Sequence, residues 1–461
     1  MKSIDILPDE ILLAVFEFCM DRMQIELRGT ESWQSLVHVC QRWRSVIFRS
    51  PRRLKLRLRC TAKTPVRDML DIWPPFLLVV DQIAGSTEDN VIAALERRDR
   101  VDRIYLYQVN GSSLENVLAA MQEPFPELTY LLLSSDEEPV PIVPDSFLGR
   151  SAPRLTFLYL RGIPFPGLPK LLLSATNLVN LQLSNIPHSG YISPDAVVTI
   201  LSALTSLQVL ILGFRSPRSH PDQASQLPPH PTRIRTVLPA LTTISFSGVC
   251  EYLDDLVARI DAPQLNNLHI TFFNDDVFDA PQFIQFISRT PTLKAVENAH
   301  VVFGDRKAII DSSYRCGVGI SCRELDWQVS SLEQLCASHL PSLSTLEDLY
   351  IYEHLYGEQP DWQDNIENTL WLDLLHRFTS VKNLYLSKEF APRIMAALQE
   401  LVGDRTTEVL PTLQNIFLEE LEPGGHFQED IGRFVAARQL SGHSMTVSHW
   451  ERDPRQEWKL Y

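Results

Sequence analysis

A short pattern of apolar residues repeats along most of the chain and constrains its fold more than any other feature. The pattern is L-x-x-L-x-L, in which L stands for any apolar residue, and it occurs eleven times in the 461 residues. Ten copies keep all three apolar positions, whereas the copy at Leu293 has Asn298 at the third. Such alternation after a turn predicts a strand in every copy. The copies begin at Val101, Leu128, Leu155, Leu178, Leu207, Leu241, Leu265, Leu293, Leu346, Val381 and Leu413.

The segments between these strands have the periodicity of helices. One of them starts with Ser193 and Pro194, which are typical of a capped helix start. Because each strand-helix unit can bury its apolar side chains only against the next unit, we expect an α/β solenoid with a parallel β-sheet over residues 51–461. The interval of 53 residues before the copy at Leu346 predicts one more, degenerate copy near 317–327.

A proline-rich segment at 216–231 interrupts the array between the copies at Leu207 and Leu241. Five of its 16 residues are proline, a density that favours an extended, polyproline-type chain. Two interpretations stay open: a disordered or polyproline-type excursion from the solenoid, or a loop that binds a partner.

The charge balance changes near the start of the repeats. Residues 1–60 hold 11 Lys+Arg and 7 Asp+Glu, a net charge of +4, whereas the whole chain carries −15, so the other 401 residues carry −19. The acidic total disfavours broad electrostatic binding of nucleic acid or of an anionic membrane and favours a protein partner. The shift in composition predicts a domain boundary near residue 50.

Two apolar patterns at helical spacing precede this boundary. Residues 11–16 hold apolar side chains after Pro8, which suits the first turn of a helix, and a second pattern covers residues 36–47. A module of 50 residues is too small to bury every apolar side chain, so part of this surface is expected to need a partner. The alternative is that the same residues cap the first repeat.

The first 50 residues resemble an F-box, the helical module that binds the adaptor Skp1 of cullin-RING ubiquitin ligases. Residues 7–12 are Leu-Pro-Asp-Glu-Ile-Leu, and residues 36–44 are Leu-Val-His-Val-Cys-Gln-Arg-Trp-Arg, with Pro51 after them. The connection at 17–35 is longer than is usual in that family, so the middle helices are expected to be rearranged. The resemblance implies that Skp1 is bound by Leu7, Pro8, Ile11, Leu12, Val15, Phe16, Leu36, Val39, Cys40 and Trp43.

The repeats resemble a divergent leucine-rich repeat array of the horseshoe type. They depart from that family at the ninth position of the repeat, where Asn or Cys is usual and most copies here have an apolar residue. The order of an F-box followed by such repeats is similar to large F-box families expanded in fungi.

The residues between the apolar positions predict a second binding surface. Side chains alternate across a strand, so these residues are expected on the open face of the sheet. Aromatic residues and Arg, which interfaces favour, are frequent among them. The alternative is that helices or loops cover this face. The candidate target-binding residues are Tyr105, Tyr107, Tyr130, Phe157, Tyr159, Arg161, His269, Tyr350, Tyr352, Tyr385 and Phe417.

A cationic run at 42–59 holds eight Lys or Arg residues and no acid. Over 54–59 the leucines and the cations alternate, which is typical of an edge strand with one charged, solvated face. A docking surface for an acidic partner, such as the C-terminal region of Skp1, and a signal for nuclear import or nucleic acid are the alternatives.

The sequence contains none of the common catalytic motifs. It lacks a phosphate-binding G-x-x-x-x-G-K-[ST] loop, a G-x-G-x-x-G turn, H-E-x-x-H and G-x-S-x-G. Cys316, Cys322, Cys336 and His339 do not have the spacing of a zinc site. We therefore expect no catalytic residue, cofactor or metal. Seven scattered cysteines and the lack of a signal-like start favour a cytoplasmic or nuclear protein with reduced thiols.

These observations favour a substrate-recognition adaptor of an SCF-type (Skp1-cullin-F-box) ubiquitin ligase. In this hypothesis the chain is not an enzyme: residues 1–50 bind Skp1 and, through it, a cullin, and the repeats bind an unknown target protein. The first alternative is a Skp1-binding or repeat-based interaction scaffold without ligase function. An enzyme is the second alternative, and it would need a buried cluster of titratable groups in a pocket.

Overall fold

The computed structural model describes most of the chain. A large, mostly parallel β-sheet of 16 strands with helices between them makes this an α/β protein. The chain divides into two compact units, with the boundary after Leu207. The described residues are 7–27, 33–51, 53–54, 56–61, 66–70, 75–82, 89–136, 140–216, 235–273, 280–293, 298–312, 315–339, 343, 345–354, 362, 366–401, 403–419 and 426–452.

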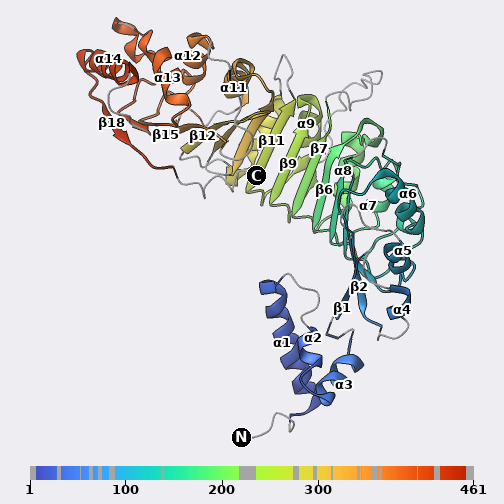
Figure 1. Cartoon of the computed structure of the whole chain (residues 1–461). Coiled ribbons are helices and arrows are strands. Elements are labelled where there is room, and N and C mark those ends of the chain that lie inside the picture. Colours follow the sequence, from blue (N-terminus) through green and yellow to red (C-terminus); the bar gives the residue numbers. More distant parts are fainter. Residues whose placement is uncertain are drawn as a thin grey trace, which may run out of the picture. The chain divides into compact units, whose positions relative to one another are not determined.

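The first unit begins with a helical module (Figure 1). It comprises α1 (Asp9–Leu27), α2 (Trp33–Val37) and α3 (Gln41–Arg49). The Cys40 thiol accepts a hydrogen bond from the Trp43 backbone N–H and caps α3. Arg42 on α3 donates to the Leu7 carbonyl at 2.6 Å and to the Asp9 carboxylate at 2.7 Å, so it ties the start of α1 to α3.

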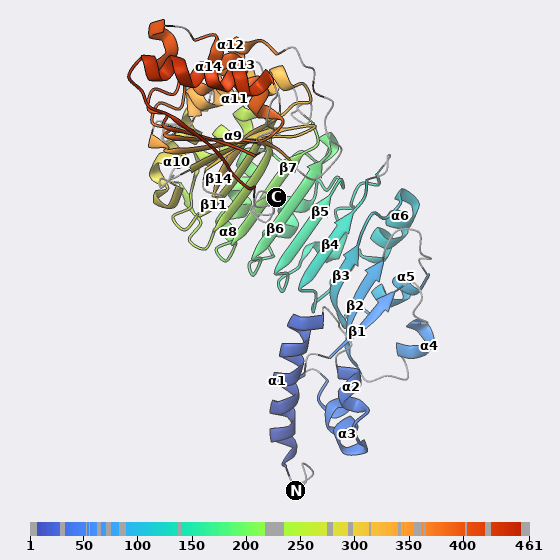
Figure 2. The same cartoon turned by 60° about the vertical axis from the view of Figure 1, so that its left-hand side comes forward.

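Six parallel strands follow in the order of the sequence. The strands are β1 (Arg57–Thr61), β2 (Leu77–Gln82), β3 (Val101–Leu106), β4 (Tyr130–Ser134), β5 (Phe157–Arg161) and β6 (Asn180–Ile186). The helices between and after them lie on one face of the strands (Figures 1 and 2). These are α4 (Val66–Leu70), α5 (Asp89–Leu95), α6 (Gly111–Ala120), α7 (Leu168–Leu172) and α8 (Pro194–Ala203), with short 3-10 turns at Phe147–Arg150 and His188–Gly190.

The second unit continues with strands of the same kind. In spatial order they are β7 (Val209–Phe214), β9 (Thr243–Gly248), β11 (Asn267–Phe273), β14 (Cys316–Ser321), β13 (Ala308–Ser312), β12 (Asn298–Phe303), β15 (Asp348–Glu353), β16 (Asn383–Leu386), β17 (Asn415–Leu418) and β18 (Thr446–His449). A separate pair joins β8 (Thr236–Val237) and β10 (Ile260–Asp261). The helices are α9 (Cys250–Val257), α10 (Pro281–Arg289), α11 (Leu325–His339), α12 (Asn368–Leu375), α13 (Phe390–Gln399) and α14 (His426–Leu440), with 3-10 turns at Pro291–Leu293 and Gly403–Thr407.

The paired strands follow the register that the repeat predicts. Leu131 lies opposite Ile104 and Leu158, and in the second unit Leu384 lies opposite Leu349 and Ile416. The apolar positions of the repeat are buried in the core. Equivalent residues of successive copies therefore lie side by side, and so do the residues between them.

The structure corrects the expectation of a wholly parallel sheet. β13 runs antiparallel to both β12 and β14, so the chain from Asn298 to Ser321 folds into three strands where the repeat predicts fewer. Glycine makes this pairing possible, since a Cβ at Gly319 would collide with the backbone carbonyl oxygen of Ala308 on β13. Strand β14 overlaps the first part of the predicted degenerate copy at 317–327.

The predicted register of the repeat copy at Leu293 is wrong. Strand β12 pairs Ala299 with Leu349 and Val301 with Ile351. The apolar positions of this copy therefore lie three residues later than predicted. His300 consequently occupies the position of Tyr350 in the next strand, and sequence reasoning missed it for that reason. Most of the proline-rich segment, from residue 217, lies outside the described residues.

Candidate functional site

The first candidate surface is on α1 of the helical module. Ile11, Val15 and Phe18 recur at helical spacing, and their exposed fractions are 49%, 40% and 67%. A neighbouring side of the helix carries Leu12 and Phe16, which are fully buried. The module thus has a core face and a separate, exposed apolar stripe, which we define as Ile11, Val15 and Phe18.

The predicted Skp1-binding residues therefore divide into three groups by exposure. Phe16 packs edge-on against Trp43, with ring centroids 4.8 Å apart, so these two aromatic residues join α1 to α3. Phe18, which the motif does not include, is the most exposed of the three stripe residues. The buried residues are Leu12 and Phe16; Leu7, Leu36, Cys40 and Trp43 are half-buried; Pro8, Ile11, Val15 and Val39 are exposed.

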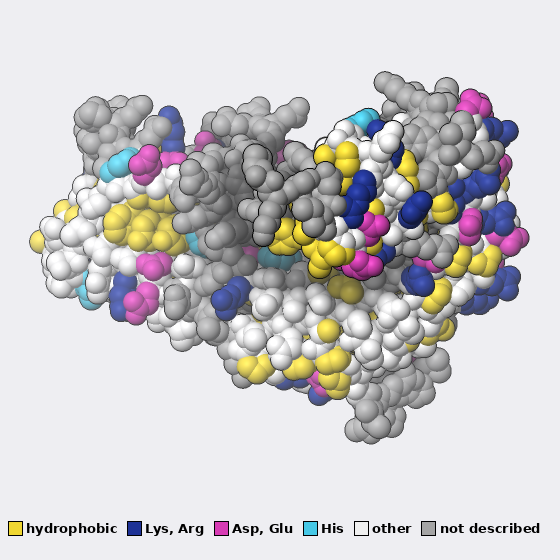
Figure 3. Space-filling view, turned by 90° about the horizontal axis from the view of Figure 1, so that it is seen from below, with side chains coloured by type: hydrophobic (Ala, Val, Ile, Leu, Met, Phe, Trp, Pro, Cys, Tyr) yellow, Lys and Arg dark blue, Asp and Glu magenta, His cyan; other side chains and the backbone are white. Residues whose placement is uncertain are grey.

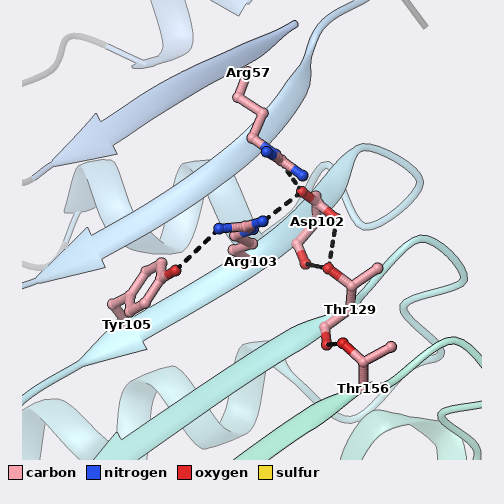
Figure 4. Close-up of polar contacts among 6 residues, drawn as sticks. All are labelled: Arg57, Asp102, Arg103, Tyr105, Thr129 and Thr156. Atoms are coloured by element: carbon pink, nitrogen blue, oxygen red, sulfur yellow. Dashed lines mark hydrogen bonds and ion pairs between the residues drawn. The ribbon is translucent and has the colours of Figure 1, made fainter. Parts of the chain in front are cut away.

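Two cations of β1 are paired with acids on neighbouring strands of the first unit, and Figure 4 shows the pair formed by Arg57. Arg57 Nε lies 2.6 Å from the Asp102 carboxylate on β3, and both side chains are largely buried. Arg59 on the same strand donates to Asp81 on β2 at 2.8 Å. Acidic side chains of β2 and β3 therefore pair with the cations of β1. Arg57 is largely buried, whereas the alternation predicts it on a solvated face.

Asp102 also starts a chain of polar contacts across the strands (Figure 4). Its carboxylate accepts a hydrogen bond from the Thr129 hydroxyl at 2.7 Å, and the Thr156 hydroxyl donates to the Thr129 carbonyl at 2.9 Å. Arg103, beside Asp102, reaches the Tyr105 hydroxyl at 3.5 Å. These contacts fix the approach of β3, β4 and β5 next to the aromatic residues of the predicted face.

An aromatic row crosses β3, β4 and β5 in the first unit. Tyr105 and Tyr130 have ring centroids 4.6 Å apart, and Tyr130 stacks on Phe157 at 4.0 Å. Burial, with the neighbouring Tyr105, raises the pKa of Tyr130 to about 12, so its phenol stays neutral at physiological pH. Tyr159 is half-buried, while Tyr107 and Arg161 are exposed. Sequence parity thus brings the predicted first-unit residues onto neighbouring strands.

A second aromatic row crosses β12, β15, β16 and β17. His300 stacks on Tyr350 at 4.5 Å, Tyr350 on Tyr385 at 4.1 Å, and Tyr385 on Phe417 at 4.4 Å. Because the rings of this row lie nearly parallel, they form one stack over four adjacent strands. We call these four residues the second aromatic row.

A polar ladder fixes the alignment of the same strands. Asn383 donates to Asp348 at 2.6 Å, Asn415 donates to Asn383 at 2.7 Å, and Thr446 donates to Asn415 at 2.6 Å. Asp348, Asn383 and Asn415 lie two places before Tyr350, Tyr385 and Phe417, and Thr446 continues the ladder on β18. The hydrogen bonds of the ladder and the buried apolar side chains of the same strands therefore fix the strands that carry the stacked rings.

The second aromatic row is partly covered by the chain itself. After β18, Trp450 lies against the rings of Tyr350 and Tyr385 at steep interplanar angles of 65° and 74°. Its indole N–H donates to the Leu386 carbonyl at 3.2 Å, and its backbone N–H donates to Leu418 at 3.1 Å. The alternative that a loop covers this face therefore holds for part of the second unit.

Arg452, two residues after Trp450, is held by contacts to strand β15. One guanidinium nitrogen lies 3.0 Å from the Glu353 carboxylate, and another donates to the Glu353 carbonyl. The guanidinium also lies over the Tyr352 ring at 4.2 Å. Tyr352, predicted to contact a target, is only 3% exposed. Its ring therefore reaches Arg452 rather than open solvent.

Polar residues continue the line of the second row toward β11. Strand pairing places His269 beside Gly317, Gly317 beside Asp311, and Asp311 beside His300. His269 Nδ1 lies 3.9 Å from the fully buried Asp311 carboxylate. Burial, reinforced by Lys307, lowers the pKa of His269, and burial lowers that of His300 to about 4. Both imidazoles are therefore neutral at physiological pH.

Other features of the described residues bear on chemistry. Burial raises the pKa of the Cys316 thiol to about 12, so it is not a reactive thiolate. Within the part of the chain that the structure describes, no group of three or more His, Cys, Asp or Glu side chains is placed to hold a metal ion. Across those same residues, every helix is too short or too polar to cross a membrane.

The surface view adds a further observation. In Figure 3 the exposed hydrophobic side chains form separate patches, with basic and acidic side chains among them. Separate apolar patches among charged residues are ordinary on protein surfaces, so this view alone does not mark an interface. Comparison with protein-family models gives no match, and comparison with curated proteins gives none either.

Proposed function

We propose that the chain is the substrate-recognition subunit of an SCF-type ubiquitin ligase, with a leucine-rich-repeat-like solenoid behind an F-box. It binds a Skp1-like adaptor through its helical module, and the adaptor links it to a cullin. The chain itself is not catalytic, because the ligase's other subunits carry out ubiquitin transfer. Such a complex would operate in the cytoplasm or the nucleus.

The exposed apolar stripe of α1 is the observation that carries this proposal. Three apolar side chains, each 40% exposed or more, recur on one helix face beside the L-P-x-E-I-L motif. The core of the same helix is already filled by Leu12 and Phe16, so the stripe is not needed to fold the module. A partner that covers the stripe would remove apolar surface from water, which stabilises the complex.

The magnitude of this contribution follows from the exposed fractions. Full burial of an apolar side chain contributes about 2 kcal/mol, so the exposed parts of Ile11, Val15 and Phe18 together offer about 3 kcal/mol. Because every 1.4 kcal/mol corresponds to about tenfold in affinity, loss of the stripe weakens adaptor binding by about 100-fold.

Substitution of the stripe tests the adaptor half of the proposal. We expect Ile11→Asp/Val15→Asp to weaken binding of a purified Skp1-like adaptor by about 100-fold or more, measured by biolayer interferometry. The matched control is Ile142→Asp, which changes an exposed isoleucine, 58% accessible, outside the module. Equal adaptor affinity for both variants would contradict docking through the stripe.

The target half of the proposal is supported by the two aromatic rows. Aromatic residues and Arg supply much of the binding energy at protein interfaces. Co-precipitation of a cullin with the chain distinguishes the ligase-subunit hypothesis from the scaffold hypothesis. The scaffold predicts adaptor without cullin, whereas the ligase subunit predicts both in one complex.

A further inference from the structure

The contacts of Trp450 and Arg452 form a compact set across three neighbouring strands. Trp450 bonds to carbonyls of β17 and β16, and Arg452 reaches Glu353 on β15. The segment therefore turns from the sheet edge onto the face that carries the second aromatic row. Its side chains at 450 and 452 both meet groups that belong to much earlier parts of the chain.

The pocket around Arg452 has the chemistry of a guanidinium site. The Glu353 side chain is only 17% exposed, and the Ser387 hydroxyl donates to its second carboxylate oxygen. The first oxygen is thereby directed at Arg452. The flat face of Tyr352 supplies a cation–π contact, and Tyr352 shares a hydrogen bond of 3.3 Å with His300. Carboxylate, carbonyl and ring face together match a planar cation better than a Lys ammonium.

A structural role alone is a weak explanation for this arrangement. Burying an ion pair costs desolvation energy that its attraction often fails to exceed, so apolar residues would hold the segment at least as well. A charged pocket instead confers specificity for what occupies it. The proposed function assigns this face of the sheet to a target protein. Trp450 and Arg452 contact the same face, so they lie where a target would bind.

We propose that Glu353, Tyr352 and the Leu386 carbonyl form a recognition pocket for an aromatic-x-Arg segment of a target protein. Residues 450–452, Trp-Glu-Arg, are an internal copy of that ligand and occupy the pocket in its absence. The inference rests on the proposed target-binding role of the second unit and names its class of ligand. It does not depend on adaptor binding by the helical module.

An external peptide must compete with residues 450–452 of the chain itself for the pocket. A tethered segment has an effective concentration in the millimolar range, so it masks the pocket against a weaker external peptide. Removing the internal Trp and Arg side chains should therefore expose the pocket to a ligand added in solution.

A peptide-binding experiment on the full chain tests the inference. The probe is a fluorescein-labelled peptide with the sequence of residues 446–452, Thr-Val-Ser-His-Trp-Glu-Arg, and the readout is fluorescence anisotropy. We expect Trp450→Ala/Arg452→Ala to bind the peptide at least about tenfold more tightly than the unaltered chain does. A peptide with Gln in place of the Arg should bind that variant about 30-fold more weakly.

Further variants separate recognition from structural effects. Adding Glu353→Gln to the double variant should abolish peptide binding, whereas Arg405→Ala, which changes an exposed Arg paired with Glu408, should leave binding by the unaltered chain as it was. If the double variant does not fold, Arg452→Gln alone replaces it, and we expect a gain in the same direction that is smaller because Trp450 stays in place. Equal peptide affinity for the unaltered and opened chains, no binding to a folded opened chain, or binding that survives Glu353→Gln would each overturn the inference. Adaptor binding by the same proteins reports separately on the helical module, so the two proposals can fail independently.

Discussion

The two faces of α1 are expected to respond differently to substitution. Phe16 is fully buried and packs edge-on against Trp43, so Phe16→Ala leaves a cavity at the centre of the module. Such substitutions cost about 3–5 kcal/mol. A module of about 50 residues has a total stability of roughly 2.5–7.5 kcal/mol, at ~0.05–0.15 kcal/mol per residue. Phe16→Ala is therefore expected to remove most of the module's stability.

The neighbouring Val15 provides the matched control. Its side chain is 40% exposed in the free chain, so Val15→Ala loses only part of one small apolar contact. We expect a cost of about 1 kcal/mol or less, which leaves the module folded. Val15→Ala should weaken adaptor binding without unfolding α1, whereas Phe16→Ala should do both.

Hydrogen exchange measured by mass spectrometry distinguishes these outcomes. In Phe16→Ala the amides of α1 should exchange about 100-fold faster or more, since an opening free energy lower by ~3 kcal/mol raises the open population by that factor. The amides of β4 and β5 should keep their protection, because they belong to the strand array. If α1 amides in Phe16→Ala remain as protected as in the unaltered chain, the assignment of this face as the module's core is wrong.

Three further predictions concern charge, protonation and thiols. Asp102→Ala leaves the largely buried Arg57 without its carboxylate, and we expect a stability loss of about 3 kcal/mol, visible as a lower Tm. Burial lowers the pKa of His300 from 6.5 to about 4, so the unfolded chain takes up a proton that the folded chain does not, and the unfolding free energy should fall by on the order of 3 kcal/mol as the pH drops from 6.5 to 4. In urea titrations His300→Asn should show a shallower fall over that interval; an identical pH profile would contradict burial of a neutral imidazole. Native protein should react rapidly with Ellman's reagent only at the three half-buried thiols, and denatured protein at all seven; the three are Cys19, Cys40 and Cys322.

The regular part of the fold was predictable because one physical requirement recurs in every repeat. Each strand must bury alternate side chains, and neighbouring strands pair in parallel, so apolar positions such as Leu158 and Leu181 must align. The same parity predicted the position of Tyr130 beside Phe157. What the pattern determines is the direction of a side chain relative to the sheet.

The pattern failed where the chain departs from one strand per repeat. The copy at Leu293 has Asn298 at its third position, whereas a frame that starts at Val296 keeps all three apolar positions, and strand pairing follows the second frame. The antiparallel β13 then takes the place in the sheet that the next parallel strand would occupy. His300 was missed as a member of the second aromatic row because the wrong frame assigns it no place between apolar positions. On α1, likewise, the sequence shows apolar residues but not which of them Trp43 covers.

The direction of a side chain does not determine whether it is covered. Tyr107 and Tyr352 follow equivalent alternations in the sequence, yet Tyr107 is 44% exposed and Tyr352 is 3% exposed. The difference at Tyr352 comes from Arg452, which is paired with Glu353 across 99 positions of sequence. A contact over that separation leaves no periodic trace, because it depends on where the chain goes after its last strand. Coverage must therefore be decided from the packed structure, and it is coverage that makes the pocket at Glu353 specific for one kind of side chain.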